Sequence, residues 1–598
     1  MHVIATAGHV DHGKSTLVRA LTGMEPDRWE EEHRRGLTIG LGFGWTTLAN
    51  GEQVAFVDVP GHEKFVPTML AGVGSVPAAL LVVAADAGWM PQSSEHLSAL
   101  DALGVRHGLL VISRADLADP EPARRQSLDI VARSGLGALS TVVVSAVTGQ
   151  GLDQLRAEIS QLVKALPAPD RQADVRLWVD RRFTLRGTGT VVTGTLAAGT
   201  VRVGDTLSIA ATGQVGKVRG LHALGEPRDE VTATARVAVN LRGVDRADVR
   251  TGDALVAPDR WLTATSLDVA VPEADRLPGR LVLHLGSAAV PVQLRPLGKL
   301  AARLTLERPL PVRYGDRVLL RDPGRHQIAA GATVLAVDPA QFRRRGAAAS
   351  RAADLTVLAA MSSGRPAAAS ELTLRQHGFR LAAELTRAGL PLAGEPISHW
   401  RADPARLAEL VRRAPTEVSA WQAENPLSAG IAVDTLRQRL DVPDREILTE
   451  LLRRAGLRVA EGVVRQEAET TLPPRVAEAV RAVRDALAAS PFSAPDAPRL
   501  AELGLGNAEL AAASRAGYLL RLPAGVVLLP DAPHIAARVL GGLPQPFGLS
   551  EARQALGTTR RVALPLLEFL DRLRITERLP DDRRRLREVD LDDSTIHA

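Results

Sequence analysis

The stretch AGHVDHGKST near the start of the chain has the residue types and spacing of a phosphate-binding loop. It fits the pattern G-x-x-x-x-G-K-[ST], with an apolar strand run before it and the helical run TLVRALTG after it. In that setting, backbone N–H groups surround phosphates at a helix N-terminus. Lys14 would reach the β- and γ-phosphates, and the Ser15 hydroxyl would bind Mg²⁺. The residues predicted to contact the nucleotide in this loop are Gly8, His9, Val10, Asp11, His12, Gly13, Lys14, Ser15 and Thr16.

Two further stretches could turn a nucleotide site into a switch. DVPGHEKF closes an apolar strand, where Asp58 would hold Mg²⁺ through water and the Gly61 N–H would sense a γ-phosphate. In RRGLTIG, between these motifs, Thr38 would add a second hydroxyl to the metal. A loop ordered by the γ-phosphate and released after hydrolysis is a two-state switch. His62 is predicted to position the attacking water, the alternative being an exposed loop histidine without a role.

A third stretch predicts which base is bound. Where Asn-Lys-x-Asp would read guanine after a strand, the chain has SRAD, from Ser113 to Asp116. The Asp116 carboxylate can accept from guanine N1–H and N2–H₂, whereas adenine has an acceptor at N1 and would be repelled. The Arg114 stem could cover the base, and Ser145-Ala146 would supply a backbone N–H toward guanine O6. We therefore predict GTP and Mg²⁺ as cofactors, although Ser113 lacks the amide of asparagine.

The elements that must position these residues follow from the pattern of apolar runs. Residues 1–168 alternate apolar strand runs with helical stretches, as in a parallel α/β sheet. Residues 173–260 and 261–340 have short β runs separated by Gly-Asp turns, which is typical of two small β-barrels. The predicted fold class is therefore multidomain, with an α/β P-loop GTPase domain, two β-barrels, then four winged-helix (α+β) domains.

The winged helices are inferred from a loose repeat in the last part of the chain. ELTLRQHGF, DTLRQRLDV, PRLAELGLG and EARQALGTT each lie between helical runs and are followed by a helix and a short β segment. Helix, turn, helix and β-hairpin together make a winged helix. The predicted domains are 350–402 with a linker helix to 425, 426–470, 471–534 and 535–598.

Composition restricts the class of protein without identifying a partner. Without cysteine, neither a disulfide framework nor a thiolate metal site is expected. No run approaches ~20 apolar residues and MHVIATAGH lacks a signal-peptide pattern, so we expect a soluble, cytoplasmic protein with no membrane partner. The net charge is only +5, and just five of the 73 basic residues are lysine, so charge alone does not mark a nucleic-acid surface.

Four collinear motifs, GHVDHGKS, RGLTIG, DVPGHEKF and SAVTGQG, together resemble the translational GTPases, the family of elongation factor Tu. DRRFTLRGTGTVVTGTL is similar to the opening of that family's second domain, a β-barrel that holds the aminoacyl end of tRNA. The winged-helix tail resembles the bacterial selenocysteine-specific branch. That resemblance implies delivery of selenocysteinyl-tRNA to the ribosome at UGA codons, with an mRNA hairpin on the terminal winged helix. We expect the chain to act as a monomer.

The resemblance also implies an amino-acid pocket on the first barrel. Asp180, Arg181 and Arg236 match positions that resemble the selenocysteine pocket of these factors. A selenol is more acidic than a thiol, so its anion dominates near neutral pH and a selective pocket should be cationic. The alternative is that these are surface arginines of an arginine-rich chain. Gly40 departs from the pattern, because relatives can carry an acidic residue there.

The last 50 residues predict an RNA-reading helix. Ser550 could cap a first helix, Gly557 allows the turn, and a second helix would follow, starting near Val562 or kinked at Pro565. Cations at a helix N-terminus oppose the macrodipole, and RNA phosphate would reverse that balance. The predicted RNA-binding residues are Arg553, Thr558, Thr559, Arg560, Arg561, Arg583, Arg584 and Arg585, the alternative being surface arginines of a generic winged helix.

Other functions would also combine these parts. A GTP-controlled nucleic-acid-binding regulator with winged-helix domains does not account for barrels that hold tRNA, and palindromic DNA sites would favour a dimer. A non-hydrolysing RNA tether would not need His62. A general elongation factor would not need the tail. An mRNA hairpin just downstream of an in-frame UGA in the same genome would discriminate best among them.

Overall fold

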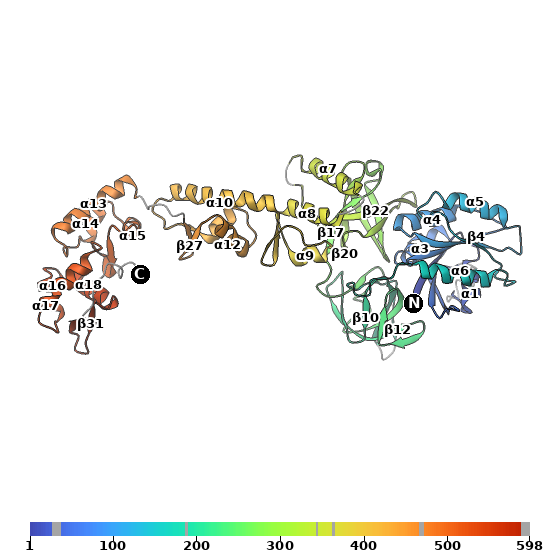
Figure 1. Ribbon diagram of the computed structural model, residues 1–598, viewed down its shortest axis with the longest axis horizontal. Helices are drawn as coiled ribbons and strands as arrows, with labels where there is room; N and C mark the ends of the chain where they lie inside the picture. Colours follow the sequence, from blue (N-terminus) through green and yellow to red (C-terminus); the bar gives the residue numbers. More distant parts are fainter. Residues whose placement is uncertain (27–37, 186–188, 343–344, 362–364, 466–471, 588–598) are drawn as a thin grey trace. The chain divides into compact units, whose positions relative to one another are not determined.

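A computed structural model describes residues 1–26, 38–185, 189–342, 345–361, 365–465 and 472–587. Helix and strand labels are those of Figure 1. Residues 34–37 of RRGLTIG lie outside the described residues, as do 186–188 of the barrel motif and the last eleven positions. The chain divides into two compact units, Met1–Asp403 and Pro404–Ala598.

The first domain of the first unit is an α/β sheet of six strands in the order β2-β3-β1-β4-β5-β6. Every neighbouring pair is parallel except β2–β3. The strands are β1 (His2–Ala7), β2 (Gly42–Thr47), β3 (Gln53–Asp58), β4 (Ala78–Ala84), β5 (His107–Ser113) and β6 (Thr141–Val143). The helices are α1 (Lys14–Thr22), η1 (Glu63–Phe65), α3 (Val66–Val73), α4 (Pro91–Leu103), α5 (Glu121–Val131) and α6 (Leu152–Ala165).

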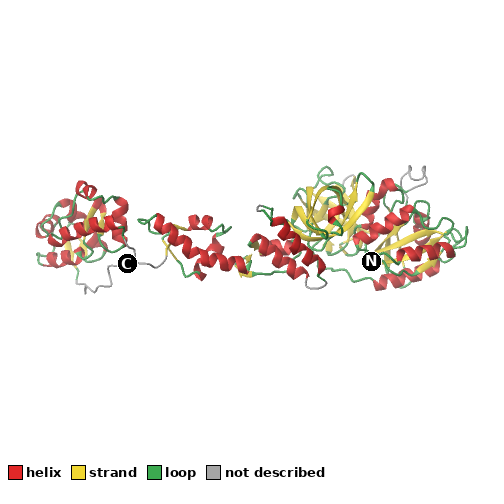
Figure 2. Cartoon of the chain, turned by 90° about the horizontal axis from the view of Figure 1, so that it is seen from above, coloured by secondary structure: helices red, strands yellow, loops and turns green. Residues whose placement is uncertain are grey.

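Helices cover both faces of this sheet (Figure 2), because its central strands are apolar on both sides. In β4 all seven residues, AALLVVA, are buried. Side chains of α1 and α6 pack on one face, and those of α3, α4 and α5 pack on the other. Parallel strands end at one edge, so the loops after β1, β3, β5 and β6 meet there, as ligand-binding loops do in open α/β sheets.

Two antiparallel barrels follow. In the first, β11 pairs with both β16 and β12 and thereby closes the sheet β11-β16-β7-β9-β15-β12. Its strands are β7 (Arg176–Trp178), β8 (Arg181–Leu185), β9 (Gly189–Leu196), β10 (Thr200–Arg202), β11 (Thr206–Ile209), β12 (Val215–Ala223), β13 (Glu226–Arg228), β14 (Glu230–Thr232), β15 (Ala235–Arg242) and β16 (Ala254–Val256). Alternate residues of ARVAVNLR are buried, which turns Arg236 and Arg242 away from the barrel core.

The second barrel is closed in the order β17-β20-β19-β18-β21-β22. Its elements are β17 (Thr263–Ala270), η2 (Ala274–Arg276), β18 (Arg280–Leu285), β19 (Ala288–Pro296), β20 (Ala301–Pro311), β21 (Arg317–Asp322) and β22 (Gln327–Val337). This barrel packs on the α/β domain. Leu319 of β21 is fully buried in the core that α3, α4 and α5 form.

The first winged helix completes this unit and is tied to the second barrel by a buried ion cluster. It consists of α7 (Ala347–Ala360), α8 (Arg365–His377), β23 (Phe379–Leu381), α9 (Ala382–Arg387), β24 (Glu395–Ile397) and β25 (Trp400–Ala402). The fully buried Asp268 carboxylate of β17 accepts from Arg303 Nε at 2.8 Å and from Arg351 Nε of α7 at 2.7 Å. Separating the two domains would therefore expose an unpaired buried charge.

The second unit holds three helix–turn–helix and hairpin groups. The first has α10 (Pro404–Glu424), β26 (Ile431–Ala432), α11 (Val433–Arg439), α12 (Arg445–Arg454), β27 (Arg458–Ala460) and β28 (Val463–Arg465). The second has α13 (Pro474–Ala489), α14 (Ala497–Glu502), α15 (Asn507–Arg515), β29 (Leu520–Leu522), η3 (Pro523–Gly525) and β30 (Val526–Leu528). The third has α16 (Ala532–Gly541), α17 (Leu549–Ala555), α18 (Arg560–Arg572), β31 (Thr576–Arg578) and β32 (Arg584–Leu586).

The last two of these groups share one core, which runs from Leu472 to Ile575.

The fold class predicted from the sequence is confirmed: an α/β domain, two barrels and winged helices follow one another along the chain. None of the described helices is long and apolar enough to cross a membrane.

Candidate functional site

The loop between β1 and α1 has a backbone that only particular residues can adopt. Gly8 has φ 135°, and a Cβ there would come within 2.2 Å of the Val82 carbonyl oxygen. Gly13, at φ 79°, lies at the N-cap position of α1. Lys14 Nζ donates to the carbonyl oxygens of Gly8 at 3.0 Å and His9 at 2.7 Å. The lysine ammonium therefore lies against the loop that would surround the phosphates.

Three oxygen-bearing side chains meet beside this loop. Ser15 Oγ donates to Asp58 Oδ2 at 2.6 Å and lies 2.9 Å from Thr38 Oγ1. Asp58 is fully buried at the end of β3, and its other oxygen accepts from Thr6 Oγ1 at 2.7 Å. Hydroxyl and carboxylate oxygens suit Mg²⁺, which binds few protein ligands and keeps phosphate and water oxygens. The donor set therefore fits the metal predicted at Ser15, Thr38 and Asp58.

The loop after β3 approaches the phosphate loop closely. A Cβ on Gly61 would lie 2.5 Å from the Val10 nitrogen and 2.6 Å from Lys14 Nζ, so glycine is required there. The next residue, His62, is half-buried, and its Nδ1 accepts from the Lys64 N–H at 3.2 Å. A neutral ring that accepts at Nδ1 carries its proton on Nε2. That proton is the group that His62 can present to a water.

Two residues of α4 that the sequence did not reveal hold the phosphate loop from behind. His96 Nδ1 accepts from the Gly8 N–H at 3.0 Å, and Gln92 Oε1 accepts from the Val10 N–H at 3.0 Å. Burial lowers the pKa of His96 well below its usual range and keeps the ring neutral, as an acceptor must be. In the sequence, this pair is indicated by the i, i+4 spacing of the two polar residues, which places them on one helix face.

The predicted base-reading residues lie at the same edge of the sheet. Ser113 Oγ donates to the His12 carbonyl oxygen at 2.7 Å and so links the SRAD stretch to the phosphate loop. Arg114 Nη1 donates to Asp86 Oδ2 at 3.2 Å, and Asp116 is exposed. The Ser145 N–H donates to the Gln150 carbonyl at 3.0 Å. Of the Ser145-Ala146 pair, the Ala146 amide is therefore the candidate donor to a base.

The predicted amino-acid pocket lies between β2 and the first barrel. A cavity of about 270 Å³ there is lined by Arg181 and Arg236, with Phe43 and Trp45 of β2 opposite them. Arg236 forms two hydrogen bonds with Asp180, one of them 2.6 Å long from Nη2 to Oδ1. Thr193 Oγ1 also donates to Asp180 at 2.8 Å, and Arg181 donates to the Leu41 carbonyl. Arg181 and Arg236 therefore line one cavity, and Asp180, which is not part of its lining, pairs with Arg236 and offsets its charge.

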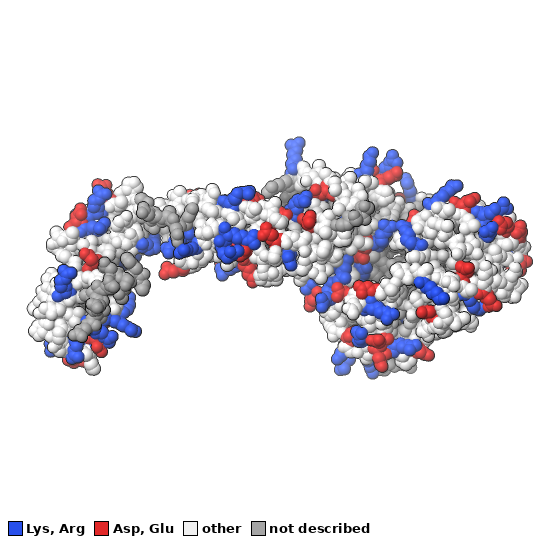
Figure 3. Space-filling view, in the orientation of Figure 1, with Lys and Arg blue, Asp and Glu red and all other residues white. Residues whose placement is uncertain are grey.

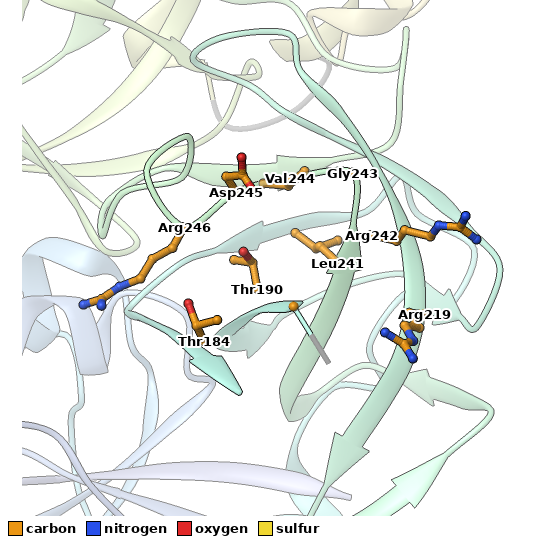
Figure 4. A pocket seen from close by; sticks show the side chains of 10 residues that line it. Thr184, Thr190, Arg219, Leu241, Arg242, Gly243, Val244, Asp245 and Arg246 are labelled. Atoms are coloured by element: carbon orange, nitrogen blue, oxygen red, sulfur yellow. The ribbon is translucent and has the colours of Figure 1, made fainter. Parts of the chain in front are cut away.

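A second hollow, of about 300 Å³, lies elsewhere on the same barrel (Figure 4) and was not predicted. Thr184 and Thr190 line it together with arginines of β12 and β15. Arg219 and Arg242 extend from these paired strands to one side, while Arg246 points away on the other. On the face shown in Figure 3, basic and acidic side chains are interspersed over the α/β domain and barrels.

The terminal winged helix differs from the prediction at the first of its two helix caps. Gly548, and not Ser550, lies at the N-cap position of α17, and its N–H donates to Glu551 Oε2 at 2.6 Å. Helix α18 starts at Arg560, after Thr559 at the N-cap position, and Pro565 lies buried inside it. Pro565 removes one N–H from the helix ladder, and the apolar contacts of its face offset that loss.

The basic residues of this domain separate into exposed and structural groups. Arg560 and Arg585 are exposed, and Arg553 is half-buried on α17. Thr558 Oγ1 and Arg561 Nη2 donate to carbonyls of the preceding winged helix, those of Phe492 at 2.6 Å and Ala494 at 2.8 Å. Arg583 pairs with Glu551 at 3.3 Å.

The prediction that Arg584 contacts RNA is wrong. Only 3% of Arg584 is exposed, and its Nε donates to Asp571 Oδ2 at 2.9 Å. In the pleat of β32, Arg584 faces the core while Arg585 faces solvent. Arg584 therefore has a structural role.

The site and its surrounding domains define a translational GTPase of the elongation factor Tu class. The family profile described as Elongation factor Tu GTP binding domain matches residues 1–165, and Elongation factor Tu domain 2 matches 189–256. Two further profiles narrow the class: Selenocysteine-specific elongation factor, beta-barrel domain matches 274–341, and Elongation factor SelB, winged helix matches 538–585. The chain belongs to the family of selenocysteine-specific elongation factors.

Individual relatives agree with this assignment. The Selenocysteine-specific elongation factor of Desulfomicrobium baculatum is 38% identical over 351 residues, which are 56% of this chain and 55% of that protein. Elongation factor Tu 2 of Streptomyces avermitilis is 36% identical over 281 residues, 43% of this chain and 72% of that one. The chain thus spans about half the length of the selenocysteine-specific relative. The crystal structure of bacterial selenocysteine-specific elongation factor EF-Sec superposes with a TM-score of 0.76 at 25% identity, covering 98% of this chain and 100% of that one.

Proposed function

We propose that this chain binds GTP with Mg²⁺, carries selenocysteinyl-tRNA and delivers it to the ribosome at in-frame UGA codons, guided by an mRNA hairpin on its last winged helix. The observation that carries the proposal is the cavity that Arg181 and Arg236 line together with the β2 edge of the nucleotide domain, with Asp180 paired to Arg236. A pocket for an anionic side chain that is built partly from a GTP-binding domain suits a carrier whose cargo binding depends on nucleotide.

The nucleotide would be held by the residues that surround the β1–α1 loop. Lys14 and the backbone of residues 8–16, apart from the N–H groups of Gly8 and Val10, would contact the phosphates, and Asp116 with the Ala146 amide would contact guanine. Ser15, Thr38 and Asp58 would hold Mg²⁺, which when bound supplies positive charge against the phosphate oxygens. Gln92 and His96 occupy two backbone N–H groups of the loop and so fix its shape.

His62 would orient the water that attacks the γ-phosphate. Its Nδ1 is occupied by the Lys64 N–H, so Nε2–H is the group directed to water. A half-buried ring held by a single hydrogen bond needs an outside contact to fix its direction. We therefore expect slow hydrolysis by the chain alone and stimulation by the ribosome.

Selectivity for selenocysteine over serine would come from charge. Near neutral pH the selenol loses its proton, whereas the serine hydroxyl keeps its own. Arg181 and Arg236 would donate to the anion, and a charge-assisted hydrogen bond in such a pocket contributes roughly 1.5–3 kcal/mol, or about 10- to 150-fold in affinity. Asp180 would keep the Arg236 guanidinium in place, with two hydrogen bonds.

The terminal winged helix would bind the mRNA hairpin. Of the arginines predicted to bind RNA, Arg553, Arg560 and Arg585 would contact RNA phosphate; Arg560 and Arg585 are exposed and Arg553 is half-buried. RNA hairpins are recognised through shape, phosphates and splayed loop bases, which suits a small basic surface. Arg561 and Thr558 would contribute indirectly, by holding the domain against the preceding winged helix.

The test compares two aminoacyl forms of the same tRNA. The full chain with a non-hydrolysable GTP analogue should bind the selenocysteinyl form about 10-fold or more tighter than the seryl form. Arg181→Ala should reduce that preference. Arg242→Ala, an exposed arginine on the same strand as Arg236, should keep it and serves as the control. Equal binding of both forms by the unchanged protein would overturn the proposal.

A further inference from the structure

The floor of the amino-acid pocket belongs to the nucleotide domain and not to the barrel. The ring centroid of Phe43 lies 4.8 Å from the Arg181 guanidinium carbon and 4.0 Å from that of Arg236. Two residues earlier, the Leu41 carbonyl accepts from Arg181. Phe43 of β2 therefore contacts both pocket arginines, and the Leu41 carbonyl just before β2 contacts Arg181.

These contacts occur in partly dry surroundings. The side chains of Arg236 and Asp180 are 13% and 6% exposed, and Phe43 is half-buried. A guanidinium over an aromatic face is attracted by the ring quadrupole, and the attraction grows when water is excluded. Phe43 can thus hold the two cations close together, although they repel each other.

The same strand leads back to the metal site. Thr38, whose hydroxyl lies 2.9 Å from Ser15 Oγ, is 8% exposed and stands five residues before Phe43. Five extended residues span at most about 18 Å, so the position of Thr38 constrains the position of Phe43. The residues that join the metal site to the pocket, 38–43, all lie within the described part of the chain.

We propose that Phe43 is a positioning residue that couples the nucleotide site to the amino-acid pocket. Its ring holds Arg181 and Arg236 in the arrangement that binds an anionic side chain, and its place on β2 makes that arrangement depend on the nucleotide bound. This inference rests on the proposed function. By linkage, the factor by which GTP raises affinity for selenocysteinyl-tRNA equals the factor by which that tRNA raises affinity for GTP.

The experiment compares three variants of the full chain. Phe43→Leu keeps apolar volume and removes the ring, whereas Phe43→Tyr keeps the ring. Phe342→Leu is the matched control, because the half-buried Phe342 also stacks on two arginines, Arg295 and Arg303, but lies outside this cavity. For each, affinity for selenocysteinyl- and seryl-tRNA is measured with GDP and with a non-hydrolysable GTP analogue, alongside affinity for the nucleotides alone.

Phe43→Leu should lose about 2- to 30-fold in affinity for selenocysteinyl-tRNA with the GTP analogue, the range expected for a cation–π contact. Its affinity for seryl-tRNA and for GTP alone should not change, and its gain on exchanging GDP for the analogue should shrink. Phe43→Tyr should restore both. The inference is overturned if Phe43→Leu behaves like Phe342→Leu, if it weakens both tRNAs equally, or if Phe43→Tyr fails to restore binding. Failure of the unchanged protein to distinguish the two tRNAs would instead overturn the proposed function.

Discussion

Removing the Arg236 guanidinium while leaving the Asp180 carboxylate should be more damaging than removing Arg181. In the intact pocket Asp180 is 6% exposed and accepts from Arg236 and Thr193. Arg236→Ala would leave a nearly buried carboxylate without its cation and close to the anion that the pocket binds. The lost charge-assisted contact accounts for about 10- to 150-fold in affinity for selenocysteinyl-tRNA, and repulsion by Asp180 adds to that loss.

A double-mutant cycle separates these two contributions. Asp180→Asn combined with Arg236→Ala removes the unpaired charge, so it should recover part of the affinity without restoring full selectivity. The assay is equilibrium binding of selenocysteinyl- and seryl-tRNA to the full chain with a non-hydrolysable GTP analogue. The reasoning is refuted if the double variant binds no better than Arg236→Ala, or if Arg236→Ala weakens both tRNAs by the same factor.

Three other outcomes follow from the site and the fold. His62→Ala should keep GTP affinity and lose about 10²-fold or more of ribosome-stimulated hydrolysis, measured in single-turnover assays. Burial lowers the pKa of His284 to about 4 from 6.5, so the folded protein keeps it neutral while the unfolded chain protonates it. His284 alone should therefore lower the unfolding free energy by up to about 3 kcal/mol between pH 6.5 and pH 4, and His284→Leu should remove that part of the decline in denaturant titrations. Arg560→Ala should weaken hairpin binding and reduce its salt slope by about one unit, whereas Arg584→Ala should lower stability instead, because it leaves Asp571 unpaired.

Much of the fold could be predicted because its signals are local. The glycines and lysine of the β1–α1 loop, the alternation of ARVAVNLR and the uninterrupted apolar run of β4 each reflect one element's own geometry. The oxygen cluster of Ser15, Thr38 and Asp58 could also be predicted from the sequence. Asp58 ends β3 and Ser15 lies at the start of α1 after β1, and parallel strands bring these two positions to one edge of the sheet.

Other features depend on contacts between distant parts of the chain. Phe43, His96 and Gln92 gain their roles from neighbours far away in the sequence, and a lone aromatic or a polar pair on a helix is more often unremarkable. Arg584 was misassigned because the wing is short. A shift of one residue in a strand reverses which side chain faces the core. The cap of α17 was also misplaced, because Gly548 and Ser550 are both acceptable at helix starts.

Selenocysteine incorporation at a UGA codon is the most direct test of the central claim. A reconstituted translation reaction would contain the full chain, GTP, selenocysteinyl-tRNA and a message with an in-frame UGA, followed either by the hairpin from the same genome or by an unrelated hairpin. We predict full-length product that depends on the chain, on GTP and on the cognate hairpin. Equal product with the unrelated hairpin, or none with either while the same reaction translates sense codons, would contradict the account.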